Sequence, residues 1–235
     1  MHGSQLQYFP VSLPFLLIFW GLIVLLVCLA TLRLLRYASL SMGITETALI
    51  VILGLSLLGS RYNIAVAHLA GHRTVTAGEI TFFGMTYMVP IVRQTQGTVL
   101  AVNVGGAIIP VLLSLYLLFK HRLFVLGAVG TVFVAVVCHF LAQPVPGFGI
   151  ALPIFVPAIA TAIIAIALTR RRAAPLAYIS GSFGTLIGAD LLNLGSIQAL
   201  GAPVASIGGA GTFDGIFVTG LLAVLYAGFS RYLHD

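Results

Sequence analysis

The sequence predicts an all-α polytopic membrane protein with about seven transmembrane helices and a short β-hairpin in an external loop. Three observations predict this class. Hydrophobic residues make up 60% of the 235 residues and charged residues only 7%, whereas soluble proteins contain roughly 25% charged residues. Apolar stretches close to the ~20 residues that a spanning helix needs recur along the chain. Basic residues gather at alternate ends of these stretches, as in multi-pass membrane proteins.

The apolar stretches define the predicted helices, of which the second and the fifth are short. Residues 1–235 are expected to form a single transmembrane domain, with 61–96 as its external loop. The predicted spans are 11–32, 44–60, 97–119, 122–142, 153–169, 175–195 and 213–230.

The basic residues predict how the chain is oriented. Alternating spans leave only Arg61, Arg73 and Arg93 on one side. Short loops rich in Lys and Arg stay in the cytoplasm, so we expect a multi-pass protein of the cell membrane with an external N-terminus and a cytoplasmic C-terminus. The basic residues on the predicted cytoplasmic side are Arg33, Arg36, Lys120, Arg122, Arg170, Arg171, Arg172 and Arg231.

The formal net charge of +6 does not indicate a nucleic-acid partner. The basic residues lie singly or in short groups between apolar stretches, and a nucleic-acid surface would require a clustered basic patch. The expected partner is the lipid bilayer, together with a membrane-embedded peptide substrate or an ion.

The loop 61–96 contains the predicted β-structure. Its segment Thr74–Val92 is rich in β-branched and aromatic residues and is interrupted by the turn residue Gly84. This pattern predicts one or two short strands at the outer membrane surface. Pro90 is expected to end the second strand or to place it at an edge. The hairpin would act as a lid or, as the more ordinary alternative, as a structural cover for helix ends.

Two acidic residues in apolar, Gly-rich surroundings are the candidate catalytic residues, Asp190 and Asp214. A charged side chain within the hydrocarbon costs about 2.5–3.5 kcal/mol on insertion scales, so each carboxylate needs a partner or a function. Further polar residues, and glycines beside Asp214, are predicted to support a cavity near the outer leaflet: Asn103, Gln143, Asn193, Glu79, Gly209 and Gly211.

Three roles for the two aspartates remain open. Carboxyl groups a few ångströms apart share a proton, so a dyad would act as general acid and base in peptide hydrolysis. Alternatively, the spans 44–142 and 153–230 form two groups of three helices with opposite orientation, which is typical of inverted-repeat transporters or channels for a cation or a proton-coupled solute. In the third alternative the aspartates only cap helices or bond to backbone in a non-enzymatic membrane protein.

Several strings of this chain resemble known families. The strings LLGSRYNI, NVGGAIIPVLLSLYLL, PGFGIALP, GADLLNL and SIGGAGTFDGIF resemble an uncharacterised family of prokaryotic membrane proteins, domain of unknown function 1614, and imply a polytopic membrane fold. Locally, GAD190LLNL and G209AGTFD214GIF resemble the two aspartate motifs of presenilin-type intramembrane proteases, which implies that Asp190 and Asp214 are catalytic. The second string has two more residues between Gly and Asp than the GxGD motif.

No cofactor or resident metal is expected. The Gly-rich run 208–211 lacks the Lys of a phosphate-binding loop. His68 and His72 stand four residues apart, but no Glu lies between them as in a metalloprotease helix, and surface histidines are the simpler interpretation.

Overall fold

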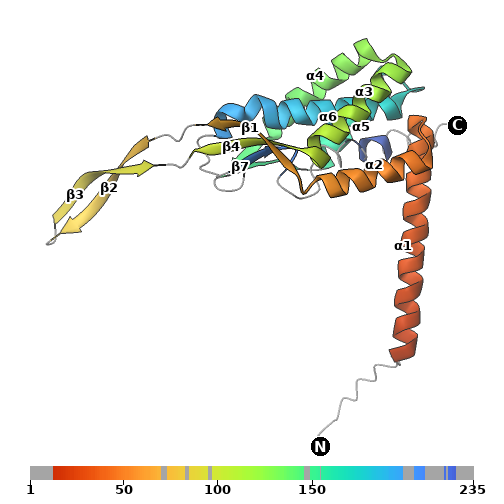
Figure 1. Ribbon diagram of the computed structural model, residues 1–235, viewed down its shortest axis with the longest axis horizontal. Coiled ribbons are helices and arrows are strands. Elements are labelled where there is room, and N and C mark those ends of the chain that lie inside the picture. The colour runs from red at the N-terminus through yellow and green to blue at the C-terminus, as the bar shows by residue number, and fades with distance from the viewer. Residues whose placement is uncertain are drawn as a thin grey trace, which may run out of the picture.

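The computed structural model describes residues 13–69, 73–82, 85–94, 97–145, 149–153, 155–197, 204–209, 220 and 222–225. These residues form a helical bundle with a small sheet at one end (Figure 1). The α-helices are α1 (Leu13–Met42), α2 (Glu46–Gly59), α3 (Ile109–His121), α4 (Phe124–Leu141), α5 (Phe155–Leu168), α6 (Ala173–Thr185) and α7 (Leu194–Ile197). Two π-helical turns adjoin them, η1 (Val104–Ile108) before α3 and η2 (Leu186–Asp190) after α6, and a 3₁₀ turn, η3 (Leu191–Asn193), follows η2.

The centre of the bundle is α6, which packs against α3, α4 and α5. All of its residues except Phe183 are buried, and many of them are Ala, Ser or Gly. Small residues let helices approach closely. A side chain at Gly184 or Gly188 would overlap α4 at Val134 or at the backbone of Ala135. The sequence of α6 therefore suits a position with helices on several sides.

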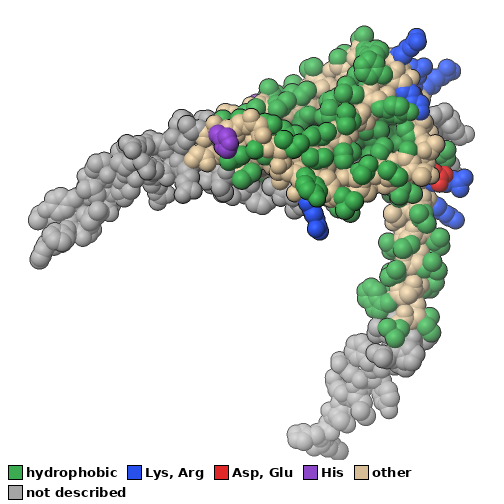
Figure 2. All heavy atoms as spheres, in the orientation of Figure 1, with side chains coloured by type: hydrophobic (Ala, Val, Ile, Leu, Met, Phe, Trp, Pro, Cys, Tyr) green, Lys and Arg blue, Asp and Glu red, His purple; other side chains and the backbone are tan. Residues whose placement is uncertain are grey.

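Three connections lie together at one end of the bundle, which we call the turn end. Lys120 Nζ donates a hydrogen bond to the Gly43 carbonyl, a ring nitrogen of His121 lies 3.0 Å from the Met42 carbonyl, and Arg172 donates to the His121 carbonyl at 2.7 Å. These bonds join the α1–α2, α3–α4 and α5–α6 connections. Figure 2 shows a group of Lys and Arg side chains at this end, close to where α1 leaves the bundle.

The opposite end, which we call the strand end, carries the β-structure. A three-stranded sheet has the order β1–β4–β7, from β1 (Asn63–Leu69), β4 (Thr98–Asn103) and β7 (Val204–Ile207). β1 and β4 are antiparallel, while β4 and β7 are parallel. The α4–α5 connection forms a short hairpin of β5 (Gln143–Val145) and β6 (Gly149–Ala151).

The predicted hairpin is present, but it does not cover helix ends. β2 (Arg73–Phe82) and β3 (Met85–Gln94) pair with each other, antiparallel, from Arg73–Gln94 to Phe82–Met85. The hairpin projects beyond the sheet and away from the helices (Figure 1). Pro90 pairs with Ala77 inside β3 and does not end the strand; in a two-stranded sheet every strand is an edge, which tolerates proline.

The predicted third span is wrong at its beginning. Residues 98–103 form β4, and the helical segment begins only at Val104. The run TVLAVN is apolar, and a short apolar run fits a buried strand as well as a helix. Among the described residues, three helical segments are long and apolar enough to cross a membrane by length and composition: Leu17–Met42, Val104–His121 and Phe124–Leu141.

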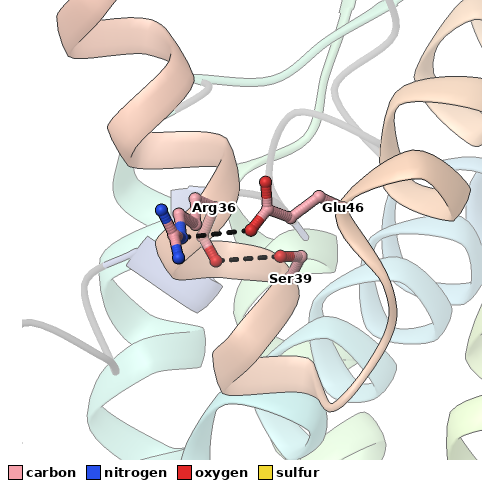
Figure 3. A network of polar contacts seen from close by, with 3 residues as sticks. All are labelled: Arg36, Ser39 and Glu46. Carbon is pink, nitrogen blue, oxygen red and sulfur yellow. Dashed lines mark hydrogen bonds and ion pairs between the residues drawn. The ribbon is translucent and has the colours of Figure 1, made fainter.

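The first helix differs from the others because it points away from the bundle (Figure 1). Only its last residues enter the core, through Ala38, Ser39 and Met42. There Arg36 Nε lies 3.1 Å from Glu46 Oε1, and Ser39 Oγ donates to the Arg36 carbonyl (Figure 3). Both charged side chains are more than half exposed, so the ion pair contributes at most about 1 kcal/mol.

Candidate functional site

Asp190 lies at the strand end, as the last residue of η2. The residue is half-buried. Its Oδ2 atom accepts a hydrogen bond of 3.0 Å from the backbone N–H of Gly208. The carboxylate therefore connects the end of the central helix to the segment after β7.

The π-helical turn that carries Asp190 is held by a side chain. Asn193 Nδ2 lies 2.9 Å from the Gly188 carbonyl oxygen and 3.0 Å from that of Ala189. A π-helical turn shifts the regular backbone bonding, so its carbonyl groups need other donors. Asn193, predicted as a site residue, is thus occupied in shaping the turn on which Asp190 lies.

Gly208 is required by geometry at its position. Its φ of +84° belongs to the left-handed region, and a Cβ atom there would lie 2.6 Å from the backbone nitrogen of Ala107 in η1. Only glycine combines this dihedral with so close an approach. Gly208 therefore contacts both Asp190 and η1.

A hydrogen-bonded node joins the three strands next to Gly208. We call Asn63, Asn103 and Ser206 the strand junction. Asn63 Oδ1 accepts from Asn103 Nδ2 at 3.0 Å and from Ser206 Oγ at 2.6 Å. Asn103 is completely buried, and it also donates to the Ser60 carbonyl at 2.7 Å and accepts from the Gly106 N–H at 2.8 Å. The junction therefore fixes β7, and with it Gly208, relative to η1.

A close crossing of α2 and η1 completes this end of the bundle. Ser56 Oγ donates to the Gly105 carbonyl at 2.5 Å. A Cβ atom at Gly105 would overlap the backbone of α2 at Ser56 and Ser60. The same crossing thus satisfies a carbonyl of η1.

The predicted site residues do not all gather around Asp190. Asn103 was predicted to lie inside the third span, and this is wrong: it ends β4 and caps η1. Gln143 is exposed at the beginning of β5, and Glu79 lies in β2 of the projecting hairpin. Gly209 has a φ of +87° and donates its N–H to the Ser206 carbonyl at 3.3 Å. Asp214 and Gly211 lie outside the described residues.

The strand junction contains residues that sequence reasoning missed. Asn63 and Ser206 were not singled out because they lie outside apolar spans, where polar residues need no explanation. Their role depends on the pairing of β1, β4 and β7, which joins segments more than a hundred residues apart. No local pattern in the sequence signals that pairing.

The turn that carries Asp190 packs against α4. Within the described ranges, no group of three or more His, Cys, Asp or Glu side chains is placed to hold a metal ion. On the adjoining α4, Cys138 is buried with its Sγ 3.7 Å from Thr185 Oγ1, and it packs with Ala189. A carboxylate at the edge of an apolar bundle has the chemistry to exchange a proton or to bind a cation, and here it also accepts the Gly208 N–H.

Comparison with known proteins identifies the family. No curated protein and no solved structure matches this chain, so the resemblance to presenilin-type proteases stays a prediction. Residues 57–226 match the model of DUF1614, a protein family of unknown function. The match begins at the end of α2 and covers α3 to α6, the three-stranded sheet and Asp190. The chain therefore belongs to the DUF1614 family.

Proposed function

We propose that this protein is an intramembrane aspartyl peptidase-like enzyme in which Asp190 and Asp214 form the catalytic dyad. One observation carries the proposal: the Gly208 N–H donates to Asp190 Oδ2 at 3.0 Å. Gly208 begins the segment GGAGTFD that ends in Asp214. This bond supports the proposal because six residues span at most about 22 Å, so the second aspartate is expected within that distance of the first.

The chemistry follows from two carboxyl groups that share one proton. The ionised carboxylate removes a proton from a water molecule, whose oxygen bonds to the peptide carbonyl carbon. The protonated carboxyl group then donates its proton to the leaving nitrogen as the C–N bond breaks. The products are a carboxylic acid and an amine, and the substrate is a peptide within or next to the membrane.

The proposed orientation places this site near the outer leaflet. The turn end carries the basic residues Lys120, Arg122 and Arg170–172, and short basic loops stay in the cytoplasm. The strand end, with Asp190, would then face the exterior. Seven spans, an external N-terminus and a cytoplasmic C-terminus belong to the same proposal.

Substitution of each aspartate tests the dyad. Asp190→Asn and Asp214→Asn should each reduce cleavage of membrane-embedded model peptides by at least a thousand-fold, because a carboxamide does not exchange the proton and each dyad member is needed. Glu46→Gln is the matched control, since Glu46 is an exposed acid at the opposite end. Mass spectrometry of the products measures cleavage. Cleavage that persists in both Asp variants would disprove the proposal.

A second candidate function is transport of protons or a cation through the bundle. The observation that favours it is a row of buried hydroxyl groups on α6, at Tyr178, Ser182 and Thr185. Their spacings of four and three residues place them on one helix face, and the row leads toward Asp190. Proton flux into liposomes that is lost in Asp190→Asn, with no peptide cleaved by wild type, would favour this function.

A further inference from the structure

A groove of about 500 Å³ lies between α2 and α3, far from Asp190, with its mouth at the turn end. Its volume falls within the roughly 300–1,000 Å³ of small-molecule sites. The walls of the groove are apolar side chains, chiefly Ala48, Ile52, Leu55, Ile109, Leu112 and Leu113.

The groove has the length of one membrane leaflet. From Thr45 at its mouth to Leu55 it follows α2 for ten residues, which corresponds to about 15 Å of helix. That distance is half of the ~30 Å hydrocarbon core. Leu55 and Leu112 are 53% and 60% exposed, so the groove is open sideways, where lipid chains lie.

Three hydrogen-bond donors surround the mouth. Lys120 Nζ donates to the Gly43 carbonyl and lies 3.2 Å from Tyr116 Oη; an ammonium has three N–H donors, which leaves one for a ligand. Tyr116 Oη accepts from Lys120, so its own O–H group can donate to a ligand. Thr45 Oγ1 accepts from the Ala48 N–H at 3.3 Å, and its O–H group can also donate to a ligand.

The charge at the mouth is positive and lacks a carboxylate. Among the residues that line the groove, Lys120 is the charged one, and it forms no ion pair with any described residue. Glu46, adjacent to Thr45 in the sequence, is paired with Arg36 at 3.1 Å. Arg122 and Arg172 lie at the same end, so the local potential favours an anion.

We propose that this groove binds one anionic phospholipid. One acyl chain lies against Ile52, Leu55 and Leu112, and the phosphate accepts hydrogen bonds from Lys120, Tyr116 and Thr45. Basic pockets between transmembrane helices are suited to lipid head groups, and the apolar length below this one fits a single leaflet. Neither the head-group donors nor the groove belongs to the site at Asp190, so this proposal stands apart from the proposed function.

Lipid binding by the purified full-length protein tests this proposal. In detergent, phosphatidylglycerol should raise the midpoint of thermal unfolding more than phosphatidylcholine with the same acyl chains. Native mass spectrometry should show one retained phosphatidylglycerol. Lys120→Gln should weaken the apparent affinity about ten-fold, the effect expected for loss of one charge-assisted hydrogen bond, while Arg170→Gln, a basic residue at the same end outside the groove, should bind as wild type does.

A second variant separates lipid binding from stability. Leu112→Trp fills the groove from an exposed position and keeps Lys120, so it should fold normally and lose the retained lipid. Equal stabilisation by both lipids, unchanged retention in Leu112→Trp, or equal stabilisation by glycerol phosphate without acyl chains would each overturn the proposal. The last result would show a free phosphate site instead.

Discussion

Asn103 combines complete burial with three hydrogen bonds to three different segments. Its amide nitrogen donates to the Ser60 carbonyl and to Asn63 Oδ1, and its oxygen accepts from the Gly106 N–H. A buried polar side chain is stabilising only while its partners are in place, because an unpaired polar group costs about 1–3 kcal/mol. The residue thus holds α2, β1 and η1 in one arrangement.

Replacing Asn103 by Ala should destabilise the protein by about 3 kcal/mol. The substitution leaves the Ser60 carbonyl and the Gly106 N–H buried without their partner. A lower midpoint of thermal unfolding in detergent would show the loss. Gln143→Ala is the control, since Gln143 is exposed and its removal should shift the midpoint little. An unchanged midpoint in Asn103→Ala would contradict the role of this residue in the strand junction.

The position of Asp190 illustrates what a sequence reveals about single residues. A carboxylate inside an apolar stretch is conspicuous, so hydropathy alone identifies it as a candidate. Its hydrogen-bond partner Gly208 lies eighteen residues later in the sequence. Hydropathy does not predict how the chain runs between the two residues. The partner depends on the pairing of β4 with β7, a long-range contact that local patterns do not encode.

At the scale of elements, the crossing of α2 and η1 rests on the absence of a side chain at Gly105. A methyl group there would overlap the α2 backbone at Ser56 and Ser60. Backbone atoms cannot rotate away as flexible side chains do, so the two elements would have to separate. Separation would also break the hydrogen bond from Ser56 Oγ to the Gly105 carbonyl.

Gly105→Ala should therefore lower stability by about 3 kcal/mol or more, the upper range for overpacking. Gly54→Ala is the matched control in α2, because a Cβ at Gly54 meets nothing within 4 Å and alanine favours helix by about 1 kcal/mol. Thermal unfolding of both variants in the same detergent measures the difference. Equal midpoints for the two variants would contradict the close crossing.

Hydropathy located the helices better than it located the strands. α2, α4 and α5 lie within the predicted ranges 44–60, 122–142 and 153–169, because continuous apolar runs with polar or turn residues at both ends are a strong signal. The apolar pattern predicts a helix at β4 because this strand is short and apolar and leads directly into the helical residues of η1 and α3. The hairpin β2–β3 was predictable because β-branched residues mark it locally, and its projection away from the bundle was not.

At the scale of the whole molecule, the basic residues of the turn end predict which side of the membrane each end of the bundle faces. In a background without Cys28 and Cys138, a membrane-impermeant maleimide added to intact cells should label Tyr62→Cys, because Tyr62 is 68% exposed at the strand end. Arg171→Cys lies at the basic turn end and should react only after the membrane is permeabilised. The reverse pattern would show that the predicted orientation is wrong.

The central place of α6 has a consequence for biogenesis. α3, α4 and α5 all pack against α6, yet the ribosome synthesises α6 after them. At 5–20 residues per second, the interval from His121 to Thr185 is roughly 3–13 s. During that time α3 lacks the neighbour that it has in the folded bundle, so the site that buries Ser114 of α3 is incomplete. The bundle can assemble fully only after α6 has been synthesised.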